Sequence, residues 1–190
     1  MAIQVVGVYG SPRKGGNSDL LLDSTLRGAR EQGAKVNRIS VRDLEISGCR
    51  ECNGCEKTGK CVVQDDMQHI YALLDAADVI VLSSPIFFYG LSSQLKAMID
   101  RGQALWARKR LEGRAANTKG RGYLLAVGAT KGEKLFLCAQ MVARYFFDAC
   151  SMTYEGGLFF EGIEGKAEIK QHPDALSQAY DLGMKLGSSA

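Results

Sequence analysis

Long apolar runs, a large excess of one charge and a histidine-centred catalytic set are all missing from this sequence. No apolar stretch approaches the roughly 20 residues that a helix needs to cross a bilayer, so we expect no membrane partner. The formal net charge of +3 is too small to indicate a nucleic-acid partner. The two histidines, His69 and His172, have no nucleophile close to them in the sequence, which leaves no Ser-His-Asp set to propose.

The first residues also lack the pattern of a signal peptide. Residues 1–6 have no basic region ahead of an apolar stretch, and without export we expect the chain to be cytoplasmic. Thiols stay reduced in that compartment. A dense run of cysteines there indicates metal binding rather than disulfides.

Apolar stretches that alternate with helical patterns predict the fold class. The chain is 46% hydrophobic and 24% charged, which is an ordinary globular composition. We expect strands at residues 3–9, 35–41, 78–83, 122–127 and 152–160. We expect helices from 17 or 18 to 33, from 65, from 92 to 109, from 133 to 149 and from 173 to 186. The alternation predicts one α/β domain over residues 1–190, with a parallel sheet and right-handed crossovers.

Four cysteines lie close together after the second predicted strand, in a cysteine-rich insert at about residues 47–66. They are spaced C-x2-C-x2-C-x5-C and are Cys49, Cys52, Cys55 and Cys61. Similar compact runs hold iron–sulfur clusters of the ferredoxin type, although the common ferredoxin run closes with three residues and a Cys-Pro pair. Here Val62 follows the last cysteine. The spacing therefore indicates a metal or a cluster, and leaves a redox cluster, structural zinc and metal-free cysteines open.

The two remaining cysteines are separate from this run. Cys138 lies in an apolar helical stretch and Cys150 lies at the end of that helix. Because free cysteine behaves as a small apolar residue, we expect both side chains to be buried. We assign neither of them a redox role.

The loop at residues 10–18 joins the first predicted strand to the first predicted helix. It offers hydroxyls at Ser11 and Ser18, an amide at Asn17 and a cation at Arg13, all next to the positive end of a helix dipole. Together these groups suit a phosphate. The loop matches neither the Walker pattern nor G-x-G-x-x-G, and a polar turn that simply caps the helix is the alternative.

Three motifs in order resemble a known family. Gly10-Ser11-Pro12-Arg13 with Asn17-Ser18 resembles the phosphate loop of the flavodoxin-like NAD(P)H-dependent FMN reductases. Ser84-Pro85-Ile86-Phe87-Phe88-Tyr89-Gly90, followed by Ser93-Gln94-Leu95-Lys96-Ala97, resembles the second flavin loop of that family. The segment from Cys49 to Met67 resembles the iron–sulfur flavoprotein branch.

The resemblance implies a doubly wound, flavodoxin-like sheet of five parallel strands in the order 2-1-3-4-5, with helices on both faces. It also implies FMN as cofactor. Its phosphate would be held by Ser11, Arg13, Asn17 and Ser18. Its ring would lie along Pro85, Ile86, Phe87, Phe88 and Tyr89, with a third contact from Gly128, Ala129 and Thr130. The family often has tyrosine at the position of Phe87, and core packing of the three aromatic residues is the alternative.

In the iron–sulfur branch the four cysteines hold a 4Fe–4S cluster, and related proteins are homodimers or homotetramers in which flavin and cluster meet across an interface. The resemblance therefore implies an FMN-dependent oxidoreductase that passes electrons between FMN and the cluster. The cofactors would carry the chemistry, so we assign no catalytic side chain. NAD(P)H is a candidate donor, and ferredoxin or a small molecule is a candidate redox partner.

Three other functions fit the same residues. The first is a cluster-free NAD(P)H-dependent FMN or quinone reductase. The second is an electron carrier that ferredoxin reduces and that has no NAD(P)H turnover. The third is an interaction module held together by zinc, which would need no flavin.

Overall fold

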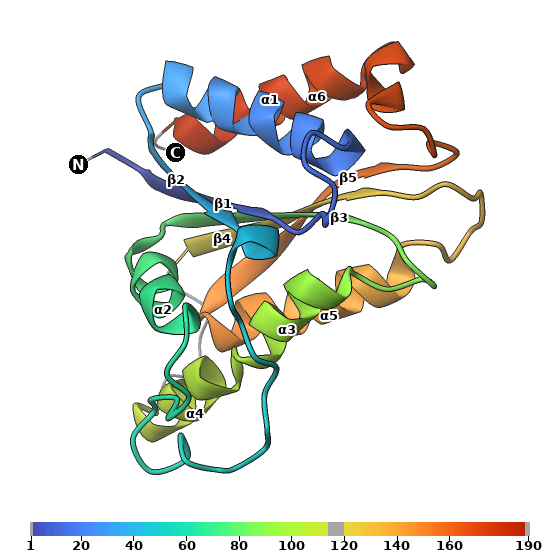
Figure 1. Ribbon diagram of the computed structural model, residues 1–190. Coiled ribbons are helices and arrows are strands. Elements are labelled where there is room, and N and C mark those ends of the chain that lie inside the picture. Colours follow the sequence, from blue (N-terminus) through green and yellow to red (C-terminus); the bar gives the residue numbers. More distant parts are fainter. Residues whose placement is uncertain (1, 114–119, 189–190) are drawn as a thin grey trace.

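A five-stranded parallel sheet forms the centre of the molecule (Figure 1). The computed structural model describes residues 2–113 and 120–188. The strands are β1 (Gln4–Tyr9), β2 (Lys35–Ser40), β3 (Val79–Pro85), β4 (Gly120–Val127) and β5 (Met152–Phe160). Their order is β2-β1-β3-β4-β5 and every neighbouring pair is parallel, which confirms the predicted flavodoxin-like topology. The order reverses between β1 and β3, where open parallel sheets bind ligands.

Helices cover both faces of the sheet (Figure 1). On one face lie α1 (Asn17–Glu31) and α6 (Ala175–Gly187). On the other lie α2 (Met67–Ala76), α3 (Ser93–Asp100), α4 (Gln103–Leu111) and α5 (Leu137–Ala149). Two short 3-10 turns, η1 (Val41–Asp43) and η2 (Glu168–Gln171), complete the elements. None of the helices within residues 2–113 and 120–188 has the length and apolarity that a membrane span needs.

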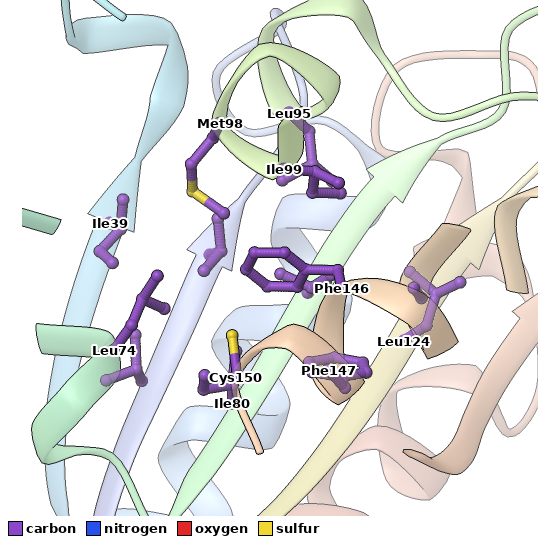
Figure 2. Packing of buried hydrophobic residues seen from close by; sticks show 14 of the residues in the cluster. Ile39, Leu74, Ile80, Leu95, Met98, Ile99, Leu124, Phe146, Phe147 and Cys150 are labelled. Carbon is purple, nitrogen blue, oxygen red and sulfur yellow. The ribbon is translucent and has the colours of Figure 1, made fainter. Parts of the chain in front are cut away.

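The central strand β3 divides the core into two halves. Val79 and Val81 pack in the cluster under α1 and α6, whereas Ile80 and Leu82 pack in the cluster under α2, α3 and α5. Figure 2 shows the second cluster, in which Phe146 of α5 and Ile80 of β3 share the core with Leu95, Met98 and Ile99 of α3. Because successive side chains of a strand point to opposite faces, a continuous apolar strand is buried on both sides. This explains the continuous apolar run at residues 79–82, within the strand predicted at 78–83.

The helix that the sequence predicts over residues 92–109 is two helices, α3 and α4, which meet at Arg101 and Gly102. A Cβ atom at Gly102 would lie 2.7 Å from the carbonyl oxygen of Ile99, so the chain turns where only glycine fits. The side chain of Arg101 is buried beneath the cysteine insert. The junction of the two helices therefore carries a side chain that contacts a distant segment of the chain.

The start of α5 and the environment of Cys138 also differ from expectation. The helix begins at Leu137 rather than at 133, because residues 133–136 form a turn closed by the hydrogen bond from Leu135 N–H to the Gly132 carbonyl oxygen. Cys138 is exposed, so its predicted burial is wrong, whereas the predicted burial of Cys150 is confirmed. The inward face of α5 is formed by Ala139, Ala143, Phe146 and Phe147. Cys138 lies beside that stripe and not in it.

Helices α1 and α6 approach each other closely because glycines face the contact. A Cβ atom at Gly183 would lie 1.9 Å from the carbonyl oxygen of Thr25, and one at Gly28 would lie 2.3 Å from that of Tyr180. Side chains at these positions would hold the helices apart. The close packing of α1 and α6 over this face of the sheet depends on the absence of side chains at Gly28 and Gly183.

We predict that Gly183→Ala lowers the free energy of unfolding by about 1–3 kcal/mol, since the added methyl group overpacks the contact. Helix propensity alone would give a gain of about 1 kcal/mol. Urea unfolding at fixed protein and cofactor concentration measures the difference. The control is Gln178→Ala on the exposed side of α6, expected within about 0.5 kcal/mol of the parent. A Gly183→Ala protein that is more stable than the parent contradicts the prediction.

Candidate functional site

A cleft of about 330 Å³ opens at the carboxyl ends of the strands, near the point where strand order reverses. We call it the phosphate-loop cleft. Seven of the predicted cofactor residues line it together: Ser11, Arg13, Asn17, Ser18, Pro85, Ile86 and Phe87. Its volume lies in the range of about 300–1,000 Å³ that is typical of small-molecule sites. Two loops that are far apart in the sequence therefore meet at one cleft.

Buried serines join the two loops. The hydroxyl of Ser92 donates to the carbonyl oxygen of Gly10, and the hydroxyl of Ser83 donates to that of Ser18 at 2.7 Å. Ser84 accepts from the Ser92 N–H at 3.1 Å. All three serines have no exposed surface. Since buried hydroxyls are costly unless they are paired, these bonds fix the ends of β1 and β3 and the start of α3 relative to one another.

The phosphate loop presents a free cation and an uncapped helix. The Ser11 hydroxyl accepts from the backbone N–H of Arg13 at 3.1 Å, which tightens the turn, while the Arg13 side chain is exposed. No side chain caps the N-terminus of α1 at Gly16. Unpaired N–H groups at a helix N-terminus bind anions, so Arg13 and the first turn of α1 suit a phosphate.

Asn17 takes a role that the sequence did not predict. Its side-chain amide donates to the carbonyl oxygen of Gly165 at 2.8 Å, and its side-chain oxygen accepts from the Ile169 N–H at 3.1 Å. Both polar ends of the side chain are therefore engaged by the segment after β5. Asn17 lies in the wall of the cleft, but it acts as an anchor for residues 165–169.

Sequence analysis did not predict the pair Asp19 and Arg42, whose hydrogen bonds hold the phosphate loop in place. Asp19 accepts from the Gly15 N–H at 2.9 Å, and Arg42 donates to Asp19 at 3.2 Å and to the Ser11 carbonyl oxygen at 2.9 Å. Burial raises the pKa of Asp19, and the opposing effects of Gly15 and Arg42 do not offset it fully. An acidic residue directly after the phosphate loop, in the first turn of α1, was the available signal, because it requires a compensating cation nearby.

The aromatic turn after β3 is exposed, so the alternative that its three aromatic residues pack in the core is wrong. Phe87, Phe88 and Tyr89 are 48%, 105% and 49% exposed. Phe87 and Gly90 exchange two backbone hydrogen bonds of 2.9 Å, and Phe88 and Tyr89 between them have φ of 49° and 63°. Bulky residues seldom adopt positive φ. Only Phe87 of the three lines the cleft.

Of the predicted third contact, only the middle residue lines the cleft. Ala129 lines the phosphate-loop cleft, whereas Gly128 and Thr130 do not appear in its wall. Their backbones instead hold the segment after β5, since the carbonyl oxygen of Gly128 accepts from Ile163 N–H at 3.1 Å. Ile163 and Glu164 line the cleft and were missed by sequence reasoning. Their position after a strand next to β4 was the signal that could have found them.

All four clustered cysteines line a second cleft of about 410 Å³, which we call the cysteine cleft. It lies against the junction of α3 and α4, where Asp100, Arg101 and Gln103 form its far wall. Cys49 and Cys52 are exposed, whereas Cys55 and Cys61 are half-buried. Burial raises the pKa of the Cys55 thiol, and the other three cysteines raise it further. The four thiols are thus near enough to influence one another.

The chemistry of the cysteine cleft can be compared with that of a bound anionic group. Among the residues that the structure describes, no three histidine, cysteine or acidic side chains converge as ligands of one ion. The four thiols line the cleft together with buried Arg101, a cation whose Nε has no partner in the described part of the chain. A cluster of several irons spans more space than one ion and carries negative charge in its thiolate cage.

Arg101 is stabilised as a cation at this cleft. Burial lowers the pKa of its guanidinium, but Asp65, with contributions from Tyr71 and Cys61, more than offsets this and raises it. For Asp65, burial would raise the pKa, but Arg101 and the N–H groups of Ser47 and Met67 lower it. The pair is therefore fully charged at neutral pH.

Comparisons with known proteins decide the family. A sequence model of the family described as NADPH-dependent FMN reductase matches residues 3–161. The chain belongs to this family. It is 35% identical to an iron–sulfur flavoprotein of Methanocaldococcus jannaschii, over 97% of this chain and 95% of the relative. It is 31% identical to an iron–sulfur flavoprotein of Archaeoglobus fulgidus, over 84% of this chain and 79% of that protein.

A solved structure supports the fold. An FMN-dependent NADH-azoreductase from Bacillus anthracis, in complex with FMN, superposes with a TM-score of 0.73 over 98% of this chain and 100% of the other, at 11% identity. Together with family membership this makes the chain an FMN-dependent oxidoreductase in the iron–sulfur flavoprotein branch. The sequence resemblance to that branch is thereby confirmed.

We predict that Arg42→Met raises the Kd for FMN about tenfold, which corresponds to about 1.4 kcal/mol, because the loop loses its bonds to Ser11 and Asp19. Fluorescence titration of FMN into apoprotein measures the Kd. Arg38→Met is the matched control. Each arginine lies 5.9 Å from the Tyr9 ring centroid, but Arg38 is half-exposed and pairs only with Asp23, at 3.7 Å. Equal Kd values for the two variants would refute a positioning role for Arg42.

Proposed function

We propose that this oxidoreductase binds FMN in the phosphate-loop cleft, holds a 4Fe–4S cluster in the cysteine cleft and passes electrons between them. The observation that carries the proposal is that seven of the predicted FMN residues line one cleft, all four cysteines line another, and one helix joins the two. Ser92, at the start of α3, bonds the phosphate loop, and Arg101, at its end, lines the cysteine cleft. The 8 residues of α3 correspond to about 12 Å of helix.

FMN, when bound, supplies hydride and single-electron chemistry. The residues of this chain bind and orient it. Arg13 and the first turn of α1 would hold the phosphate, with Ser11 and Ser18 in the same wall. Pro85, Ile86 and Phe87 would lie along the ring and exclude water from it. No side chain needs to act as acid or base, so we assign no catalytic residue.

The remaining predicted contacts lie outside the wall of the cleft or are engaged elsewhere, so we propose different roles for them. Asn17, Gly128 and Thr130 would support the FMN site through the segment after β5, to which their polar groups are bonded. Phe88 and Tyr89 would meet the ring or a partner only at the mouth of the cleft, because they are exposed. Since every described element packs on one sheet, we treat residues 1–190 as one domain with the cysteine insert at 47–66.

The second candidate is a cluster-free NAD(P)H-dependent FMN or quinone reductase. The observation in its favour is that two of the four cysteines, Cys49 and Cys52, are exposed, and exposed thiols in a metal-free segment would leave the FMN site unchanged. NAD(P)H is the proposed donor in both cases. A ferredoxin or a small molecule is the proposed partner of the cluster-containing enzyme.

We predict that protein prepared without oxygen shows flavin absorbance above a broad iron–sulfur shoulder, and releases FMN, iron and acid-labile sulfide. Cys55→Ser should lose the iron and sulfide while keeping FMN, because it removes one ligand of the cysteine cleft. Cys138→Ser, at an exposed cysteine on α5, is the control and should keep all three. Parent protein that contains FMN but no iron would favour the cluster-free reductase. Parent protein that does not bind FMN would contradict both candidate functions.

We also propose a homodimer or homotetramer, on the evidence of one apolar face. Within the described residues, the exposed large hydrophobic side chains lie in the cysteine insert, the β3–α3 loop, α4 and α5, and none lies in α1 or α6. A groove of about 550 Å³ between α3, α4 and α5 is lined by Trp106, Met141 and Tyr145. It shares Asp100 and Gln103 with the cysteine cleft. A second copy seated there would cover the edge of that cleft.

We predict that Tyr145→Glu yields a monomer in native mass measurements, because it places a charge in the apolar groove. Gln178→Glu, on exposed α6 at the opposite face of the sheet, is the control and should keep the oligomer. An unchanged mass for Tyr145→Glu would exclude this face as the interface.

A further inference from the structure

Arg101 bonds both ends of the cysteine insert with one guanidinium group. Its side chain is 1% exposed. Its Nη1 donates to the carbonyl oxygen of Ser47 at 3.0 Å, and its Nη2 donates to that of Val63 at 3.3 Å. Ser47 lies two residues before Cys49, and Val63 lies two residues after Cys61. The four cysteines are therefore enclosed in a loop whose two stems meet at one side chain.

Asp65 completes the connection. It accepts from Arg101 Nη1 at 2.6 Å and from the backbone N–H of Ser47 at 3.0 Å. Ser47 is thus held by both its carbonyl oxygen and its N–H. We call Arg101 and Asp65 the clasp. Because α3 fixes Arg101 and the first turn of α2 follows Asp65, the clasp attaches the insert to two helices.

The clasp also places a positive charge beside the cysteines. Arg101 lines the cysteine cleft and lies close enough to Cys61 for its guanidinium to interact with the thiol. Its Nε is one of two buried side-chain nitrogen or oxygen atoms in the described residues that have no hydrogen-bond partner. An unpaired buried donor is costly, and an acceptor in the cleft would satisfy it. The tyrosine hydroxyl of Tyr71 donates to the Arg101 carbonyl oxygen at 2.8 Å, which holds that turn in place.

We propose that Arg101 is a positioning residue for the cysteine insert, which fixes its two stems and supplies a buried cation that favours the more negative, reduced state of the group bound there. The proposal rests on the proposed function only in its second half, since the stems are held whether or not a cluster is present. Charge and hydrogen bonds near the sulfurs set the reduction potential of a cluster, and partners behind the ligands contribute strongly to metal affinity.

The test uses the full chain, reconstituted anaerobically with iron and sulfide, in three variants. Arg101→Met removes the bonds and the charge. Arg101→Lys keeps a charge but loses the planar fork that reaches both stems. Arg144→Met removes a charge from the exposed side of α5 and is the control. The readouts are iron loss to a chelator, the midpoint potential of the cluster, and the alkylation rate of the cysteines in iron-free protein.

For Arg101→Met we expect iron loss at least about tenfold faster than in the parent, a lower midpoint potential and faster alkylation of the four cysteines, with Cys138 as internal reference. For Arg101→Lys we expect faster alkylation but a potential close to that of the parent. Arg101→Met behaving like Arg144→Met in all three readouts would overturn the proposal. If the midpoint potential of Arg101→Lys were as low as that of Arg101→Met, the proposal that the Arg101 charge favours the reduced state would be wrong.

Two further measurements test the proposal if Arg101→Met does not fold or if the parent takes up no iron. If Arg101→Met does not fold, Asp65→Asn opens the clasp while keeping the cation, and we expect faster alkylation without a lower potential. If the parent takes up no iron, the proposed function fails. The alkylation rates then still decide whether Arg101 holds the stems, so the two failures are distinguishable.

Discussion

The parallel pairing of β1 with β3 is the constraint on which both clefts depend. Gly10 donates its N–H to the carbonyl oxygen of Ser83 at 2.7 Å directly beyond the last paired residues, so the chain leaves both strands at one place. The phosphate loop follows one strand and the aromatic turn follows the other. Because β3 is buried on both faces, this pairing cannot slip without moving the whole core.

The connection between β2 and α2 is joined to both clefts by two arginines, half-buried Arg42 and buried Arg101. Arg42 belongs to this connection and reaches back to the phosphate loop, whereas Arg101 reaches into it from the junction of α3 and α4. The long segment at residues 44–66 has no helix or strand of its own. Such a segment is ordered by polar contacts at its ends, since it has little apolar surface to bury. Arg101 supplies such contacts at Ser47 and Val63, while Arg42 joins the turn before the segment to the phosphate loop.

Sequence patterns predicted the features that depend on local spacing. The phosphate loop and the grouping of the four cysteines in one cleft correspond to what residues near one another in the chain indicate, whereas the strand order followed from the family resemblance. The features that sequence reasoning missed are contacts over long separations. Arg42 meets Asp19 across 23 positions, and Asn17 meets Gly165 across 148. Arg101, at the junction of α3 and α4, likewise donates to Ser47, 54 positions away.

The Asn17 side chain attaches the segment after β5 to the phosphate-loop cleft, so that this segment forms part of the entrance. Two hydrogen bonds join the first turn of α1 to residues 165–169, and Ile163 and Glu164, just before them, form part of the wall. Insertions or deletions between β5 and η2 therefore reshape the entrance without touching either loop that follows β1 or β3. Related proteins with this fold can therefore differ in the electron acceptors they use through changes in the segment between β5 and η2 alone. That segment forms no part of the sheet.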